Sequence, residues 1–268
     1  MAMLQYQFIQ RALIAGVALS FITPILGLLL ILRRQSLLSD TLSHVSLVGV
    51  ALGLLLKFNL TVSTIIVVVI ASMLLESMRR MYRNFSEVSI AVMMSGGMAL
   101  ALVLLSLSTS ASSVQIDKYL FGTILLITQQ EVYLLIGLAV IVVILYAIYH
   151  RILYVMSFNE DTAHTSGLPV QFISMAISVI NGIVISLMMP IVGALLVSAL
   201  VVIPAATSIS ISKSFNQAIG IGIVINLIGI IGGIISSFYF DTPPGATITL
   251  FFIVIFVVTS LIKNQFTD

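Results

Sequence analysis

The chain has 268 residues, of which 60% are hydrophobic and 7% are charged, and its mean hydropathy is +1.25. A water-soluble domain usually carries about 25% charged residues, so this composition excludes a soluble protein and predicts an integral membrane protein in contact with lipid. The sequence has no cysteine, which excludes disulfides and a thiolate metal site. The formal net charge of only +2, from scattered basic residues, gives no indication of nucleic-acid binding.

The apolar runs predict an all-helical bundle. They are about 20 residues long and lack strict alternation, which is typical of membrane helices and excludes the shorter strands of a barrel. We expect the whole chain, residues 1–268, to form a single transmembrane domain. Roughly nine spanning helices are predicted, at about 8–32, 37–56, 61–79, 88–107, 132–149, 172–189, 192–206, 218–238 and 246–262.

The connections predict the orientation in the membrane. With the N-terminus outside and the C-terminus in the cytoplasm, eight of the 11 lysines and arginines face inward, as the positive-inside rule requires. The loop at 151–170 is then cytoplasmic and the segment at 108–128 is external. Within that segment, residues 119–128 are apolar but too short to span, so we expect a re-entrant or interfacial piece.

Residues 39–46 read SDTLSHVS and place a carboxylate and an imidazole, Asp40 and His44, inside an apolar run. Four residues apart, they share one helix face. If the helix begins near Arg34, they lie about 9 and 15 Å deep, which puts His44 near the middle of a core about 30 Å thick. Ionisable groups at such depth usually mark a functional path.

A carboxylate and an imidazole are suitable ligands for zinc or manganese. One chain supplies two of them, and a twofold dimer would supply four around a shared axis. The alternative interpretation is structural. Asp40 would then serve the helix dipole or pair with Arg33 and Arg34, and His44 would bond a neighbouring carbonyl.

The loop at 158–170 predicts a short helix. Glu160 and Asp161 favour its N-terminus, and Gly167 and a following proline end it. The small residues Ala163 and Gly167, four apart, would let this helix lie close to a partner surface. An ordinary connection between two membrane helices is the alternative.

Three further positions carry polar or helix-breaking residues, and two of them have two interpretations each. Pro204 lacks an amide hydrogen within a membrane helix and could line a path or only kink the helix. Asp241, in an external turn, could take part in gating or simply form the turn. Glu76 lies three and four residues before Arg79 and Arg80, which predicts an ion pair within one helix and a structural anchor.

Residues 31–53, ILRRQSLLSDTLSHVSLVGVALG, closely resemble the corresponding stretch of the ABC transporter permeases for zinc and manganese. The segments 119–128, 193–208 and 238–250 resemble further parts of that family in the same order, and 158–170 resembles its coupling helix. The motif Ser-Asp-Thr-Leu-Ser-His is more similar to the zinc members. Manganese members read Gly-Asp-Ala-Ile-Ser-His with a proline soon after, where this chain has Val48.

The resemblance implies the membrane subunit of an ATP-driven importer of divalent metal in a prokaryotic cell membrane. Two copies would form the pore, two separate ATP-binding subunits would hydrolyse ATP, and an extracellular or periplasmic metal-binding protein would deliver the ion. By position, Asp40 and His44 would contact the metal, which is a substrate and not a permanent cofactor. Zinc is the expected ion, with manganese or iron as alternatives.

One departure from the family concerns the fourth predicted helix. Some zinc permeases carry a histidine there, whereas this chain has Gly96 and Gly97, which allow close approach of helices.

Two other functions are possible for a membrane protein with these residues, and the sequence favours neither. A secondary metal transporter would need no coupling helix, and a membrane zinc protease would need an H-E-x-x-H motif that the sequence lacks. The chain also lacks a phosphate-binding loop, G-x-x-x-x-G-K-[ST], so we expect no enzyme activity of its own.

Overall fold

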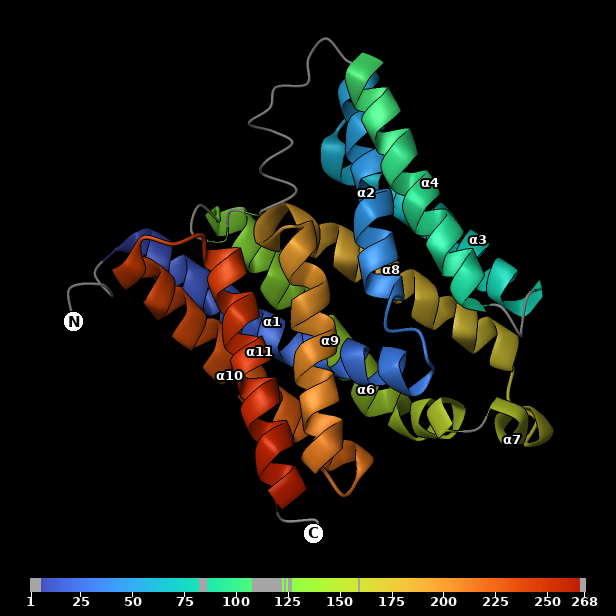
Figure 1. Ribbon diagram of the computed structural model, residues 1–268. Helices are drawn as coiled ribbons and strands as arrows, with labels where there is room; N and C mark the ends of the chain where they lie inside the picture. The colour runs from blue at the N-terminus through green and yellow to red at the C-terminus, as the bar shows by residue number, and fades with distance from the viewer. Residues whose placement is uncertain are drawn as a thin grey trace. The chain divides into compact units, whose positions relative to one another are not determined.

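The computed structural model describes residues 6–81, 86–107, 122, 124, 127–158 and 160–265. Across these residues the chain forms helices and no strands (Figure 1). The helices are α1 (Gln7–Leu32), α2 (Leu38–Leu55), α3 (Leu60–Met81), α4 (Ser86–Leu107), α6 (Gln129–Phe158), α7 (Glu160–Thr165), α8 (Val170–Val192), α9 (Ala194–Ile211), α10 (Phe215–Phe240) and α11 (Pro244–Gln265).

A helix lies at each of the nine positions predicted from the apolar runs. Eight of them are long and apolar enough to cross a membrane, and α9 contributes a shorter apolar helix, Leu196–Ile211. The all-helical, multi-pass membrane protein predicted from composition is therefore confirmed. The expected re-entrant piece at 119–128 lies mostly outside the described residues.

Helix α6 is longer than predicted at both ends, and its start has a local cause. The Oε2 atom of Glu131 accepts hydrogen bonds from the amide and the hydroxyl of Thr128, at 2.8 and 2.9 Å. The Thr128 hydroxyl in turn accepts from the amide of Glu131 at 3.3 Å. This reciprocal capping box satisfies amides that the first turn leaves free. Its signal, T-x-x-E, is present in the sequence.

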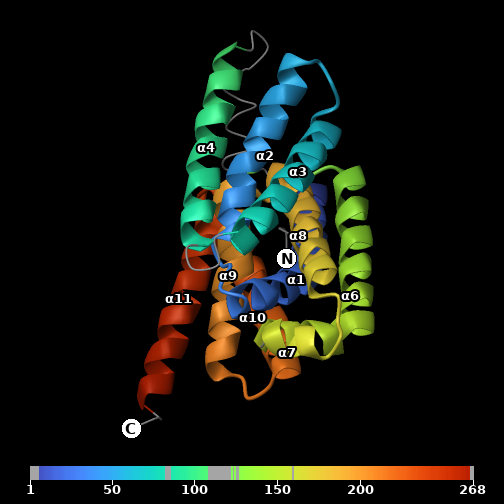
Figure 2. The same ribbon diagram turned by 90° about the vertical axis from the view of Figure 1, so that its right-hand side faces the viewer.

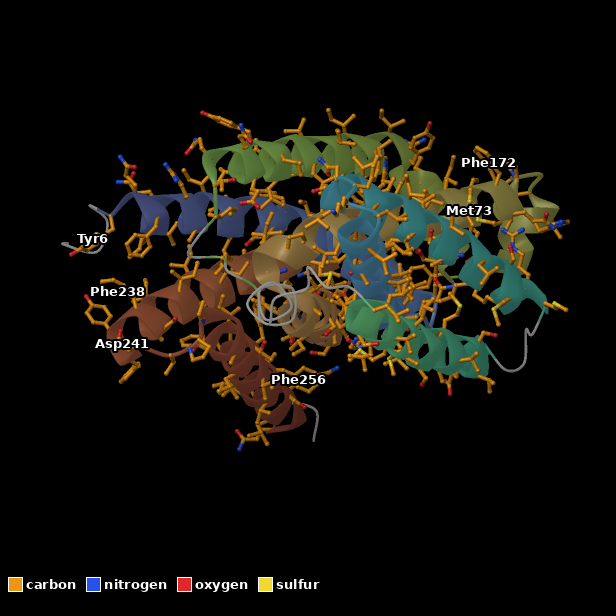
Figure 3. The ribbon with its side chains drawn as sticks, turned by 90° about the horizontal axis from the view of Figure 1, so that it is seen from above. Tyr6, Met73, Phe172, Phe238, Asp241 and Phe256 are labelled. Atoms are coloured by element: carbon orange, nitrogen blue, oxygen red, sulfur yellow. The ribbon has the colours of Figure 1, made fainter. Side chains whose placement is uncertain are left out.

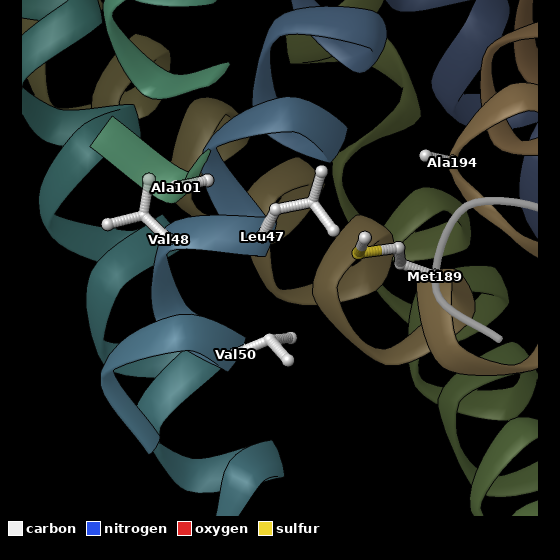
Figure 4. Close-up of a cluster of buried hydrophobic side chains, with 6 residues drawn as sticks. All are labelled: Leu47, Val48, Val50, Ala101, Met189 and Ala194. Atoms are coloured by element: carbon white, nitrogen blue, oxygen red, sulfur yellow. The ribbon is translucent and has the colours of Figure 1, made fainter. Parts of the chain in front are cut away.

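One compact unit contains residues 37–122 and 164–197, with α2, α3, α4 and α8 packed side by side (Figure 2). Helix α2 contacts the other three. Its apolar side chains join a buried cluster with α4, α8 and the start of α9 (Figure 4): Leu47, Val48, Val50, Ala101, Met189 and Ala194.

Close helix contacts in this unit depend on glycines. A methyl group on Gly49 would lie 2.5 Å from the Thr64 Cα atom, so the backbones of α2 and α3 touch there. The close approach predicted for the glycine pair of α4 is confirmed at Gly97, where a methyl group would lie 2.8 Å from Val45 Cγ2. At Gly96 the same methyl group would meet open space.

The second compact unit contains residues 1–36, 123–163 and 198–268. In it α1 packs against α6 and α10, and α10 packs against α11. A methyl group on Gly233 would lie 2.8 Å from the Ile248 Cα atom, which shows how closely α10 and α11 approach. The buried Asn226 amide of α10 donates to the Thr23 hydroxyl of α1 at 2.9 Å.

Large apolar side chains also cover the outside of both units. Met73, Phe172 and Phe256 are exposed and project away from their helices (Figure 3). Such surfaces are unfavourable in water but suit contact with lipid, in agreement with the predicted membrane location.

Candidate functional site

Asp40 and His44 lie on one face of α2, as their spacing predicts. Asp40 is in the first turn of the helix. Its Oδ1 atom lies 4.0 Å from His44 Nε2, and the two side chains are 36% and 21% exposed. Both groups are therefore partly buried yet accessible from the surface of their unit.

Neither group is fully satisfied by the other. A separation of 4.0 Å is too long for a hydrogen bond. The buried Nδ1 atom of His44 also has no hydrogen-bond partner within the described part of the chain. Buried polar groups normally have partners, so this imidazole is not held by a full set of hydrogen bonds, and its Nε2 atom faces the carboxylate of Asp40.

The neighbouring hydroxyl groups of α2 are occupied by their own helix. Thr41 donates to the carbonyl of Leu37 at 3.0 Å, and Ser43 donates to the carbonyl of Ser39 at 2.8 Å. Farther along, the Ser46 hydroxyl donates to the Ser43 carbonyl at 2.7 Å and also contacts the Met189 sulfur. These hydrogen bonds leave the carboxylate of Asp40 and the imidazole of His44 as the candidate metal ligands of this helix.

The two groups are close enough to bind one small metal ion after a small side-chain movement. Zinc bonds to nitrogen and oxygen are about 2.0–2.2 Å long and tetrahedral, so two ligand atoms on one ion lie about 3.4 Å apart, against 4.0 Å here. Among the described residues, no group of three or more His, Cys, Asp or Glu side chains could hold a metal. The described residues of one chain thus bring together two candidate ligands, Asp40 and His44.

Helix α7 forms within the loop for which a short helix was predicted. Gly167 ends it with a positive φ of 78° and donates its amide to the carbonyl of His164 at 3.1 Å. Glu160 and Asp161 occupy its first turn. Ala163 is fully buried within the chain, whereas a methyl group on Gly167 would meet open space. The two small residues therefore do not share one exposed surface.

Pro204 and Asp241 belong to the unit of α1, not to that of Asp40 and His44. Pro204 is buried inside α9, which continues through it. Asp241 is the C-cap of α10, with φ 50° and ψ 39°, and its amide donates to the carbonyl of Ser237. Figure 3 shows it at the end of α10, close to Phe238. This left-handed conformation is one that aspartate tolerates well, as the turn interpretation predicts.

The ion pair predicted within α3 is confirmed, at 2.9 Å from Arg79 and 3.6 Å from Arg80 to Glu76 Oε1. A second set of contacts at Glu76 has no signal in the sequence. Glu76 is completely buried and also accepts hydrogen bonds from Ser174 and Ser178 of α8. Serines are too common in membrane helices for these two to have been singled out.

The sequence model of the ABC 3 transport family matches residues 5–263. The high-affinity zinc uptake system membrane protein ZnuB of Buchnera aphidicola is 28% identical over 259 residues, covering 96% of this chain and 99% of its own length. The manganese transport system membrane protein MntC of Listeria monocytogenes is 27% identical, with 97% and 92% covered. A solved structure, PsaBC from Streptococcus pneumoniae in complex with Fab, gives a TM-score of 0.84 at 26% identity, covering 96% and 92% of the two chains.

Proposed function

Because the chain belongs to the ABC 3 transport family, we propose that it is the membrane-spanning subunit of an ATP-driven importer of divalent metal, with zinc as its ion. The observation that carries the proposal is the pair Asp40 and His44, partly exposed on α2 and 4.0 Å apart. The similar zinc and manganese transport proteins support a divalent metal as substrate. The zinc protein and the manganese protein are almost equally identical to this chain, at 28% and 27%. The choice of zinc therefore rests on the motif at residues 39–44, which is more similar to the zinc members.

The metal path requires a second copy of the chain. Two ligands hold a transition metal weakly, whereas two Asp and two His side chains around a twofold axis would complete four-coordination. A homodimer with the two α2 helices at its axis supplies this set. A site made only of oxygen and imidazole ligands, without thiolates, also suits an ion that must leave again.

The proposed topology has nine spanning helices, including α9, with the N-terminus outside and the C-terminus in the cytoplasm. The whole chain then acts as one permease domain. Arg33, Arg34, Arg79, Arg80 and Arg151 face the cytoplasm in this topology, as the positive-inside rule favours. Helix α7 and the loop around it lie on the same side.

ATP hydrolysis belongs to a pair of partner subunits in this proposal, which dock against the α7 loop. Glu160 and Asp161 begin this helix, and Gly167 leaves an open surface beside it. Ala163 is buried and therefore does not face the partner in this proposal, whereas Thr162, His164 and Thr165 are exposed and do.

Transport would proceed by alternating access. A metal-binding protein outside the cell delivers the ion, Asp40 and His44 hold it briefly, and the ATPase cycle opens the path inward. Pro204 and Asp241 are the candidate path-lining or gating residues, with a kink in α9 and the turn after α10 as their structural alternatives. Because the metal binds the deprotonated forms of carboxylate and imidazole, protons compete with it and uptake should weaken at low pH.

The test is uptake of zinc-65 and manganese-54, counted side by side in cells that lack their own zinc and manganese importers. The cells would express the wild-type chain or the His44→Ala variant with the partner ATPase and delivery protein. His150→Ala is the matched control, because that exposed imidazole bonds only its own helix at Ala147. Zinc uptake lost in His44→Ala alone supports the ion and the site. Manganese uptake instead of zinc, or zinc uptake indifferent to His44, contradicts one of them.

A further inference from the structure

The carboxylate of Glu76 makes a complete set of contacts between two helices. Its Oε1 atom accepts from the Ser174 hydroxyl at 2.7 Å and from Arg79 at 2.9 Å. Its Oε2 atom accepts from the Ser178 hydroxyl at 3.1 Å and from Arg79 at 3.3 Å. The guanidinium of Arg79 also donates to the Ser174 hydroxyl at 3.1 Å. These residues, with Arg80, form what we call the α3–α8 clamp.

The clamp holds α8 at its beginning, directly after the coupling loop. Helix α7 ends at Thr165 and α8 begins at Val170, so only four residues separate them. Arg80 donates to the backbone carbonyl of Gln171, in the first turn of α8. Residues from His164 onward belong to the same compact unit as α8.

Contact between the two helices continues beyond the clamp. Ser174, Ser178 and Gly182 recur every four residues on one face of α8, a small-residue pattern that allows helices to approach closely. A methyl group on Gly182 would lie 3.1 Å from Val68 Cγ1 and 3.4 Å from Ser72 Cβ. Helices α3 and α8 are therefore in contact from Glu76 to Val68.

Helix α3 is tied in the same manner to α2, which bears the proposed metal ligands. The Ser63 hydroxyl donates to the backbone carbonyl of Gly49 at 2.7 Å. At this level the backbones touch, since a methyl group on Gly49 would lie 2.5 Å from the Thr64 Cα atom. The contacts thus run without interruption from the start of α8 through α3 to α2.

We propose that Glu76 is a positioning residue that makes α3 and α8 move as one body. A displacement of the loop before α8 is then carried to the α2–α3 pair and to Asp40 and His44. A buried carboxylate is costly in a membrane protein unless its partners are fixed, so the clamp favours a single arrangement of the two helices. This inference rests on the proposed function, because it concerns the link between ATP hydrolysis and metal movement.

The first test links α3 and α8 by a disulfide bond, so that they can no longer move relative to one another. The chain has no cysteine, so Ser72→Cys with Gly182→Cys introduces its only two thiols. Their Cβ atoms would lie 3.4 Å apart, close to the separation of about 3.5–4.5 Å found in disulfides. We expect the bond to form on oxidation and zinc transported per ATP to stay within about twofold of the reduced form. Failure of the bond to form, or loss of transport when it forms, overturns the proposal.

The second test removes the clamp hydroxyls by Ser174→Ala with Ser178→Ala. The measurement is zinc moved per ATP hydrolysed, in vesicles containing the purified chain, its ATPase and its delivery protein. The matched control is Ser72→Ala with Ser186→Ala, whose buried hydroxyls bond only to Val69 and Ile183 of their own helices. We expect the clamp variant to lose about tenfold in zinc per ATP while hydrolysis continues, and the control to stay near wild type.

Adding the oxidised disulfide to the clamp variant should restore coupling, and reduction should remove it again. A purely structural role predicts that zinc transport and ATP hydrolysis fall together, so that zinc moved per ATP stays unchanged in the clamp variant. A clamp variant as well coupled as wild type overturns the inference and leaves the proposed function intact. A wild-type chain that moves no metal in an ATP-dependent manner overturns both.

Discussion

Two acid–base pairs at helical spacing lie in the same compact unit, Asp40 with His44 on α2 and Glu76 with Arg80 on α3. Glu76 is fully buried, and both of its oxygens accept hydrogen bonds. Asp40 is 36% exposed and lies 4.0 Å from an imidazole whose Nδ1 atom has no partner among the described residues. The same sequence spacing thus produces a saturated anchor in one helix and an open site in the next.

The difference teaches how to separate structural from functional charges in an apolar helix. A charge that stabilises the fold is expected to have its partners in place, because an unpaired buried charge is costly. A charge that binds a transient ion must keep part of its bonding capacity free. Substitutions in the saturated pair should therefore act on stability, and on transport only through the positions of the helices that the pair holds. Substitutions in the open pair should act on transport directly.

The largest expected effect is on stability, from Glu76→Ala. It would leave the guanidinium of Arg79 and two buried serine hydroxyls without their acceptor, which should cost about 3–5 kcal/mol. Protein level and the unfolding temperature in detergent report the loss. A variant as stable as wild type would show that the clamp is not the anchor of α3 and α8.

The next effect is on transport, from Asp40→Asn. Loss of a ligand charge should reduce zinc uptake by about 100-fold, while the unfolding temperature stays near wild type because that carboxylate forms no hydrogen bond with the described residues. Radioactive zinc uptake and thermal unfolding are measured on the same preparation. Normal uptake, or a strong loss of stability, would remove the contrast between the two pairs.

A smaller effect on stability is expected from the packing of α2 against α3, the helices that carry the two pairs. Gly49→Ala should destabilise the protein by about 1–3 kcal/mol, because its methyl group would meet the backbone of Thr64. Gly96→Ala is the control in a neighbouring helix and should be neutral or slightly stabilising, by up to about 1 kcal/mol, since its methyl group meets open space. Equal unfolding temperatures for the two variants would contradict the close contact of α2 and α3.

The smallest effect is expected from Asp241→Asn. This variant tests whether Asp241 only forms the turn after α10 or takes part in gating. Asparagine also tolerates the left-handed conformation, so stability should change by less than about 0.5 kcal/mol and zinc uptake should stay near wild type. A clear loss of uptake at unchanged stability would favour gating. Asp241→Val, which disfavours positive φ, provides the unstable comparison.

The sequence was sufficient to predict where helices form, because apolar runs of about 20 residues in lipid have few alternatives. It also predicted the shared face of Asp40 and His44, since the spacing of four residues is a property of a single helix. The start of α6 was placed three residues late, although Thr128 and Glu131 carry a recognisable capping box.

The sequence alone does not predict which helices contact one another. The spacing of Glu76, Arg79 and Arg80 predicted their ion pair, but periodicity within one helix does not identify the helix opposite. Ser174 and Ser178 therefore gained their role only from the structure. Ala163 shows the same limit, because a small residue in a short helix can face a partner or its own chain, and here it is buried.

Thr41 and Ser43, on either side of the ligand pair, return their hydroxyls to carbonyls of α2 itself. Bonds of this kind remain intact when the helix turns about its own axis, so these two residues add no hydrogen-bond contribution to the barrier for such a rotation. They also tend to bend a helix slightly. The hydroxyls nearest to Asp40 and His44 thus stabilise α2 itself, and the position of this helix depends on its packing against α3 and α4.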